Sequence, residues 1–210
     1  IETLKDSAAL SANEALTPLG KQIARLPLDV GMGKLAILGI VLRCLDAAIT
    51  ITAILSTKSP FSVSQNQSDN RIATIKASFS RGESDLLLHY QAYLAWQNAC
   101  RQGREYEFCR KHLLSSQVLS QIEDQKVSLL VNLADAGLLL LHGQEMDLLR
   151  RARVNRRRSD FFTVPERYNE LSDNDSGICA VVAAAFYPKL LIWEGKGWRN
   201  VSSNQHVSLA

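Results

Sequence analysis

Apolar residues recur every three or four positions over most of this chain, the spacing of a helix that buries one face. This spacing predicts one helix that begins at Pro18 and stops at Pro27, and a second that carries Leu35, Leu38, Leu42 and Leu45 on one stripe. It predicts further helices over 47–56, 72–79, 85–100, 106–114, about 117–139 and 178–186. After Pro188 the sequence has the residue pattern of β-strands, which predicts strands at 190–193, 198–201 and 206–209. The sequence therefore predicts a mainly α fold that ends in a small β module.

Short polar motifs mark where some of these helices begin. Thr17 precedes Pro18, so its hydroxyl can accept a hydrogen bond from an unpaired amide while the proline fits the first turn. Asp46 is predicted to cap the helix over 47–56. That helix is rich in Ile and Thr, which favour helices poorly, so we expect it to be stabilised by burial between its neighbours.

Composition excludes some classes of protein. Hydrophobic residues make up 46% of the 210 positions and charged residues 21%, which excludes a fully disordered chain or a collagen-like fibre. The net charge of +3 does not by itself indicate a polyanionic partner. The longest apolar runs, such as 178–187, fall short of the roughly 20 residues that span a bilayer, so we expect no membrane segment. Without an initiator Met, the sequence resembles an excised fragment.

The four cysteines, Cys44, Cys100, Cys109 and Cys179, form no close pair. Disulfide frameworks and zinc sites usually need denser or paired cysteines. We expect four buried, reduced thiols in a cytosolic or nuclear protein.

Catalytic and nucleotide-binding motifs are missing from the sequence. The stretch GMGK at 31–34 lacks the spacing and the Ser or Thr of a phosphate-binding loop, and a turn into a helix explains it better. Glu123 and Asp124 are adjacent on a helix and so point in different directions. The histidines do not pair with carboxylates or cysteines at ligand spacing and are predicted to be packing or surface residues. We therefore predict no catalytic, cofactor-binding or metal site in this chain.

Positive charge is concentrated in two places near the C-terminus. Six arginines fall within nine residues: Arg150, Arg151, Arg153, Arg156, Arg157 and Arg158. The strand segment adds Lys189, Lys196, Trp198 and Arg199, together with Trp193. Guanidinium groups bind phosphates in a bidentate way, and indoles beside cations suit stacked bases, so these residues are candidates for contact with single-stranded nucleic acid. A solvated basic loop, a nuclear-import tract or a sheet with Trp in its core would also explain them.

Several motifs then resemble the helicase-associated region of DEAH/RHA-type ATP-dependent RNA helicases. They are LTPLGK at 16–21, LPLD at 26–29, GKL at 33–35, CLD at 44–46, AILS at 53–56 and SPF at 59–61. Further on, SDLL at 84–87, YLAW at 93–96, FC at 108–109 with its following leucines, and FYP at 186–188 resemble the family's ratchet and its OB-fold entry. The stretch DQKV at 124–127 departs from the family's usual pattern, so an RNA contact there is not expected.

The resemblance implies a winged helix over 1–61, a helical-bundle ratchet over 71–141, a basic linker over 142–175 and the start of an OB-fold over 176–210. About three of the five OB-fold strands are visible. It also implies that the chain packs on RecA-like domains of the same polypeptide and helps to form a channel for single-stranded RNA. ATP and Mg²⁺ would bind those RecA-like domains.

Two alternatives remain open from the sequence. The chain could be a protein-interaction module that docks a helicase regulator or a ribosomal surface. It could also be a helix-turn-helix DNA reader, although the helix over 34–45 is mostly apolar, which disfavours an exposed recognition surface.

Overall fold

The structure is a computed structural model that describes residues 1–61, 69–82, 84–154 and 160–208. Its helices are α1 (Glu2–Asp6), α2 (Pro18–Ile23), α3 (Val30–Val41), α4 (Leu45–Leu55), α5 (Asp69–Phe79), α6 (Asp85–Arg101), α7 (Glu105–Lys111), α8 (Ser116–Asp135), α9 (Gly143–Val154), the 3-10 helix η1 (Glu166–Tyr168) and α10 (Asp175–Phe186). The strands β1 (Leu191–Trp193), β2 (Trp198–Asn200) and β3 (His206–Val207) follow. The prediction of a mainly α chain that ends in a small β module is confirmed.

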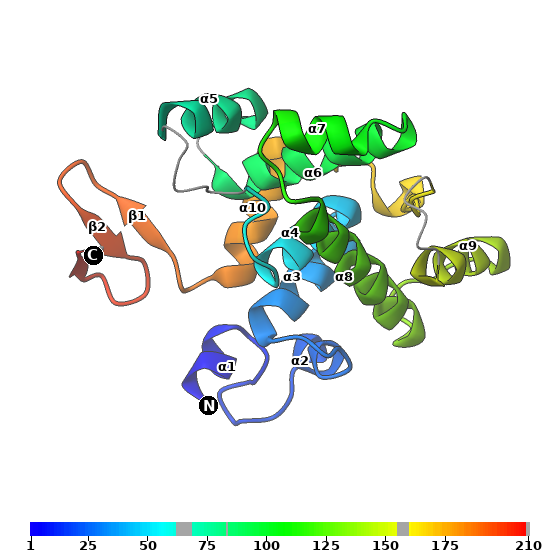
Figure 1. Cartoon of the computed structure of the whole chain (residues 1–210). Helices are drawn as coiled ribbons and strands as arrows, with labels where there is room; N and C mark the ends of the chain where they lie inside the picture. The colour runs from blue at the N-terminus through cyan, green and yellow to red at the C-terminus, as the bar shows by residue number, and fades with distance from the viewer. Residues whose placement is uncertain (62–68, 83, 155–159, 209–210) are drawn as a thin grey trace.

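Helix α4 lies at the centre of the molecule and packs against α3, α6, α8 and α10 (Figure 1). Every residue from Leu45 to Ile54 except Asp46 is buried. Its β-branched residues are poor helix formers in isolation, and the hydroxyl of Thr52 donates to the carbonyl of Ala48 at 2.8 Å instead of facing water. Burial on all sides stabilises this helix, as its composition predicts.

Helix α2 begins as its sequence predicts. The backbone amide of Gly20 donates to Oγ1 of Thr17 at 2.9 Å, and Pro18 occupies the first helical position. The same Thr17 hydroxyl donates to the carbonyl of Ala8 at 2.7 Å, which ties the start of α2 to the segment after α1. This single residue therefore both caps a helix and fixes the path of the chain that leads into it.

The boundary between α3 and α4 differs from the prediction. Helix α3 ends at Val41 with Leu42 as its C-cap, and Leu45 begins α4, so the stripe expected on one helix is divided between two. Asp46 is not the cap, because the position before α4 is Cys44, which makes no side-chain capping bond. The backbone amide of Asp46 instead donates to Oδ1 of Asn169 at 2.9 Å, so a side chain far along the sequence satisfies this first-turn donor.

Two apolar cores hold the helices together. The first lies between α4, α6, α8 and α10 and contains the fully buried Tyr93, Trp96 and Ile122. The second joins α3 and α4 to the later half of α8 and to α9, around Leu45 and Leu130. Both cores therefore combine side chains from 1–61 with side chains from 71–141, and the division of the chain into those two domains stays a prediction.

The three strands form an antiparallel sheet in the order β1-β2-β3. Trp193 lies opposite Trp198 across β1 and β2, and the turn between them contains Gly195 with a φ of +79°. The sheet projects away from the end of α10, and all three β1 side chains are exposed (Figure 1). That these strands are the start of an OB-fold stays a prediction.

Candidate nucleic-acid interface

Half of the arginine cluster lies on a helix. Arg150, Arg151 and Arg153 occupy the later turns of α9 and are all exposed. The helix is anchored by Leu149, which is fully buried in the second core. The interval 142–175, expected to be a linker, thus contains α9 and η1. Arg156, Arg157 and Arg158 lie outside the described residues.

The start of α9 is fixed by an ion pair. Nη1 of Arg167, in the segment after α9, lies 2.7 Å from Oε1 of Glu145. The backbone amide of His142 donates to Oε2 of the same carboxylate at 2.8 Å. The hydrogen bonds from Arg167, and then that from His142, lower the pKa of Glu145 to about 2. Glu145 and Arg167 therefore neutralise each other, whereas the three described arginines of the cluster form no ion pair with any described residue. Exposed arginines without a carboxylate partner can bind phosphate without first breaking a bond.

The sheet arranges its candidate residues on two faces. Trp193 and Trp198 are directly opposite each other, with ring centroids 5.3 Å apart, so both indoles lie on one face. Arg199 follows Trp198 in β2 and points to the other face, beside its cross-strand partner His206. The pleat of the strand therefore places the indoles and Arg199 on opposite faces, so they do not form the single platform that the sequence predicts.

Arg199 is also occupied. Its Nε donates to Oε1 of Glu194 at 2.6 Å and its Nη1 donates to Oδ1 of Asn204 at 2.5 Å. A phosphate would have to displace these partners. Lys189 and Lys196 are exposed, so they are the cations of this segment that face solvent.

The structure does not bring the two candidate groups together. Helix α9 and the sheet lie on opposite sides of the helical bundle (Figure 1). A single strand that contacted both groups would have to pass across the body of the molecule. That each group binds nucleic acid stays a prediction.

A buried ion pair, not apparent from the sequence, joins two of the central helices. Nζ of Lys126 on α8 lies 2.7 Å from Oδ1 of Asp46 on α4, and the side chains are 3% and 15% exposed. The hydroxyl of Tyr90 on α6 lies 3.5 Å from Oδ2 of the same carboxylate. Burial, and then the nearby Asp46, raise the pKa of Tyr90 far above its usual value, so the phenol stays a hydrogen-bond donor.

A second buried group extends this network along α6 and α8. The hydroxyl of Tyr93 donates to Oε2 of Glu123, and Nε2 of Gln97 lies 3.4 Å from the same oxygen. The ring of Tyr93 also lies 5.2 Å from Nζ of Lys126. Glu123 and Lys126 are spaced in register with apolar residues of α8 such as Ile122, and this spacing was the signal that could have revealed the network, since buried charges are rare unless they are paired. The network holds α4, α6 and α8 in place. Lys126, the lysine of DQKV at 124–127, is buried in this network and is therefore unavailable to RNA.

The other motifs take the roles that the sequence favours. Residues 31–34 lie inside α3, where a Cβ on Gly33 would contact Ile23 at 3.0 Å, so they form a packed helix and not a phosphate loop. His89 lies against the ring of Phe61, and His112 against Phe79 and Phe108, so both are packing residues.

The cysteine prediction is wrong at one position. Cys44, Cys100 and Cys109 are buried, whereas Cys179 on α10 is exposed. Within the part of the chain that the structure describes, no group of three or more His, Cys, Asp or Glu side chains has metal-site geometry, and no helix is long and apolar enough to cross a membrane.

Comparison with known proteins gives two domain matches and several relatives. The helicase-associated (HA2) winged-helix domain matches residues 1–28 and the ratchet-like HA2 domain matches 29–120. The chain is 36% identical over 190 residues to the putative ATP-dependent RNA helicase DHX57 of Homo sapiens, and the aligned residues make up 90% of this chain and 14% of that protein. It is 30% identical over 199 residues to the DExH-box ATP-dependent RNA helicase DExH1 of Arabidopsis thaliana, which covers 95% of this chain and 18% of that protein.

A third relative is the ATP-dependent DNA/RNA helicase DHX36 of Rattus norvegicus, 32% identical over 192 residues that cover 90% of this chain and 17% of that protein. The chain thus spans less than a fifth of the length of these relatives. The two matched ranges adjoin within the helical part of the fold, and they account for α1 to α7 and the start of α8. On these matches, the chain belongs to the helicase-associated (HA2) winged-helix and ratchet-like domains of the DEAH/DHX-type ATP-dependent RNA helicases.

Proposed function

We propose that this chain is the accessory region of an ATP-dependent RNA helicase, which packs on the RecA-like domains of the same polypeptide and helps to form the channel for single-stranded RNA. The observation that carries the proposal is the pair of adjoining HA2 matches over 1–120, supported by relatives whose names describe ATP-dependent RNA helicases. In this proposal ATP and Mg²⁺ bind the RecA-like domains, and residues 31–34 of this chain, which form a helix and not a phosphate loop, take no part in nucleotide binding. The parent enzyme works in the cytosol or nucleus.

The contact with RNA is made through backbone charge and not through base sequence. The arginines of α9 are exposed and have no carboxylate partner among the described residues, which suits bidentate binding of phosphate oxygens. The exposed Lys189 and Lys196 and the paired indoles of the sheet supply a second, weaker contact. Binding of this kind is independent of sequence and sensitive to salt.

Replacing the six arginines at 150–158 by alanine tests this proposal. Labelled single-stranded RNA is titrated into the wild-type chain and the variant at low salt, with circular dichroism to check that both are folded. A variant in which Lys21 and Arg25 are replaced, two exposed cations of α2 and the loop after it, gives the loss of affinity per positive charge removed outside the cluster, with which the loss per arginine is compared. The proposal predicts that the six-arginine variant loses about tenfold or more in affinity while the control stays close to wild type; equal affinities would contradict it.

Docking of a regulatory protein is the second candidate function, and a groove on α9 favours it. A cavity of about 480 Å³ lies between α9 and residues 160–166, lined on its apolar side by Leu148, Ala152 and Phe161. Leu148 is 57% exposed, so this apolar surface is accessible to a partner. If the six-arginine variant keeps its RNA affinity, the channel role of α9 is wrong and docking is favoured.

A further inference from the structure

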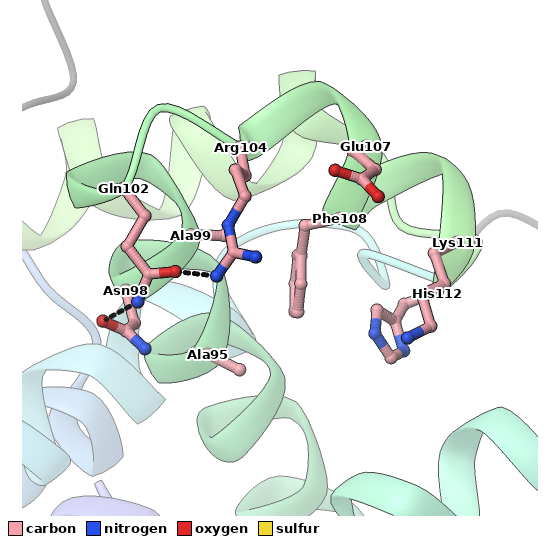
Figure 2. Close-up of a pocket in the computed structure, with 9 residues that line it drawn as sticks. All are labelled: Ala95, Asn98, Ala99, Gln102, Arg104, Glu107, Phe108, Lys111 and His112. Carbon is pink, nitrogen blue, oxygen red and sulfur yellow. Dashed lines mark hydrogen bonds between the residues drawn. The ribbon is translucent and has the colours of Figure 1, made fainter.

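A second positively charged surface surrounds α7, outside the residues that the sequence singles out. A pocket of about 310 Å³ lies between the end of α6 and α7 (Figure 2). Next to it, a hollow of about 610 Å³ is lined by Arg71 of α5, by residues of α7 and by Leu113. Glu107 and Lys111 line both, so the two hollows adjoin along these side chains. We call this the α7 surface and define it by Arg71, Arg104, Tyr106, Arg110 and Lys111.

The cations of the α7 surface are available to a ligand. Arg71, Arg104, Arg110 and Lys111 are all exposed, and none forms an ion pair with a described residue. Other arginines of the chain are occupied, since Arg43, Arg81, Arg167 and Arg199 each have a carboxylate oxygen within 4 Å. Among the residues that the structure describes, Glu107 is the one carboxylate that lines the two hollows, so their described lining carries an excess of positive charge.

The pocket adds groups that can contact a base. Figure 2 shows the guanidinium of Arg104 beside the ring of Phe108, with the carboxamides of Gln102 and Asn98 on one side and Lys111 and His112 on the other. Gln102 accepts a hydrogen bond from Arg104 and donates to Oδ1 of Asn98 at 3.3 Å, which orients both carboxamides at the pocket wall. An aromatic ring and a guanidinium can stack on a base, and the remaining hydrogen-bonding capacity of the two carboxamides can serve its polar edge. The volume is within the range of small-ligand pockets.

Tyr106 provides a stacking surface outside the pocket. It is 80% exposed, which is unusual for a large aromatic side chain, and its spacing from Arg110 places both on one face of α7. Exposed aromatic residues that alternate with cations are typical of platforms for single-stranded nucleic acid. An acidic peptide would use the cations but would gain little from the aromatic rings or the carboxamides.

We infer that the α7 surface is a further binding site for single-stranded RNA, separate from the arginines of α9 and from the sheet. Arg71, Arg110 and Lys111 bind backbone phosphates, Tyr106 stacks on one base, and the pocket between Arg104 and Phe108 holds another. The inference goes beyond the proposed function by adding a surface, and it rests on that function because the ligand is the same strand.

The test uses the whole 210-residue chain and a fluorescein-labelled oligouridylate of about 12 nucleotides. Fluorescence anisotropy is measured at several salt concentrations for wild type, Arg104→Ala/Lys111→Ala, Tyr106→Ala and the control Lys21→Ala/Arg25→Ala, which removes the same charge from the α2 region. We expect the first variant to weaken binding about tenfold relative to the control, because it removes one wall of the base pocket and the phosphate contact of Lys111. The slope of log K against log salt should fall by about 0.7, as one lost phosphate contact on a single strand requires. Tyr106→Ala weakens binding about fivefold or more, whereas Tyr106→Phe keeps it.

Crosslinking supplies a measurement that does not depend on variants. An oligonucleotide that contains 4-thiouridine is irradiated on the wild-type chain, and the crosslinked peptides are identified by mass spectrometry. Crosslinks to the segment 98–112 support the inference.

The outcomes separate the two claims. If the wild-type chain binds RNA but Arg104→Ala/Lys111→Ala has the affinity of its control, the α7 inference is wrong and the proposed function stands. If a glutamate-rich peptide displaces the RNA as effectively as unlabelled RNA does, the surface recognises acidic peptides and the inference is also wrong. If the wild-type chain binds no RNA even at low salt, both claims fail.

Discussion

Lys126 Nζ lies 2.7 Å from Oδ1 of Asp46, and this ion pair joins the middle of α8 to the first turn of α4 inside the helical bundle. The lysine side chain is 3% exposed. Because α4 packs against four other helices, the pair fixes the helix on which both apolar cores depend.

Replacing Lys126 by methionine should destabilise the fold strongly. The substitution keeps the apolar part of the side chain but leaves the mostly buried carboxylate of Asp46 without its charge partner. Breaking a buried pair from one side costs about 3 kcal/mol or more. Urea denaturation followed by circular dichroism measures the loss of unfolding free energy.

The matched control is Arg43→Gln, which removes one partner of the exposed pair between Arg43 and Glu170. Surface pairs contribute about 1 kcal/mol or less, so this variant should unfold close to wild type. Equal effects of the two substitutions would show that the pair between Asp46 and Lys126 is not buried as described.

Gly20→Ala should be a second severe substitution, for a steric reason. A Cβ on Gly20 would lie 2.0 Å from the carbonyl oxygen of Ala9, which is backbone and cannot move without displacing the segment before α2. Such a clash costs about 2 kcal/mol or more. Gly143→Ala is the control, because a Cβ there meets no atom within 4 Å. Thermal unfolding of both variants checks this; a Gly20→Ala chain as stable as the Gly143→Ala chain would contradict the close approach.

The ion pair between Glu145 and Arg167 predicts a dependence of stability on acid. The pKa of Glu145 is about 2 in the fold against an ordinary 4.5, chiefly because Arg167 donates hydrogen bonds to it. A lowered pKa means that the contribution is complete above about pH 4.5 and is lost as the pH falls toward 2. The difference in urea midpoint between wild type and Glu145→Gln should shrink across that interval. A difference that stays constant from pH 6 to acid would rule out the pair as its cause.

Thiol reactivity should distinguish Cys179 from the other cysteines. Cys179 is exposed, whereas Cys109 is buried and its thiol pKa is raised to about 11, mainly by burial, so little thiolate forms there at neutral pH. A thiol reagent such as DTNB should modify one cysteine rapidly in the folded chain and the others only on unfolding. Cys179→Ser should remove the rapid phase; if the rapid phase persists, another cysteine is accessible.

Much of the helical fold could be predicted because its signals are local. The start of α2 is determined by two adjacent residues, since Thr17 caps the helix and Pro18 fits its first turn. Gly103, with a φ of +69°, follows the end of α6, where the sequence predicts that the helix ends. Helix α9 was not predicted because its only buried residue is Leu149, so it has no apolar stripe to detect. Asp46 was misassigned as a cap because Lys126 and Asn169, which bind it, are distant in sequence.

The candidate site could be predicted only in part, for the same reason. The run of arginines is evident from the sequence, and three of its members are exposed on α9. The pleat that places Trp198 and Arg199 on opposite faces depends on strand register, and the α7 surface depends on the approach of α5, α6 and α7. Neither relationship lies within one stretch of sequence.

Titration of the 210-residue chain with labelled single-stranded RNA, repeated at about 50 and 200 mM salt, tests the central claim most directly. An accessory region that grips the RNA backbone should bind at the lower concentration, independently of base sequence, and lose about tenfold or more in affinity at the higher one. Absence of binding at 50 mM salt, or an affinity unchanged by salt, would contradict the claim that this region holds RNA.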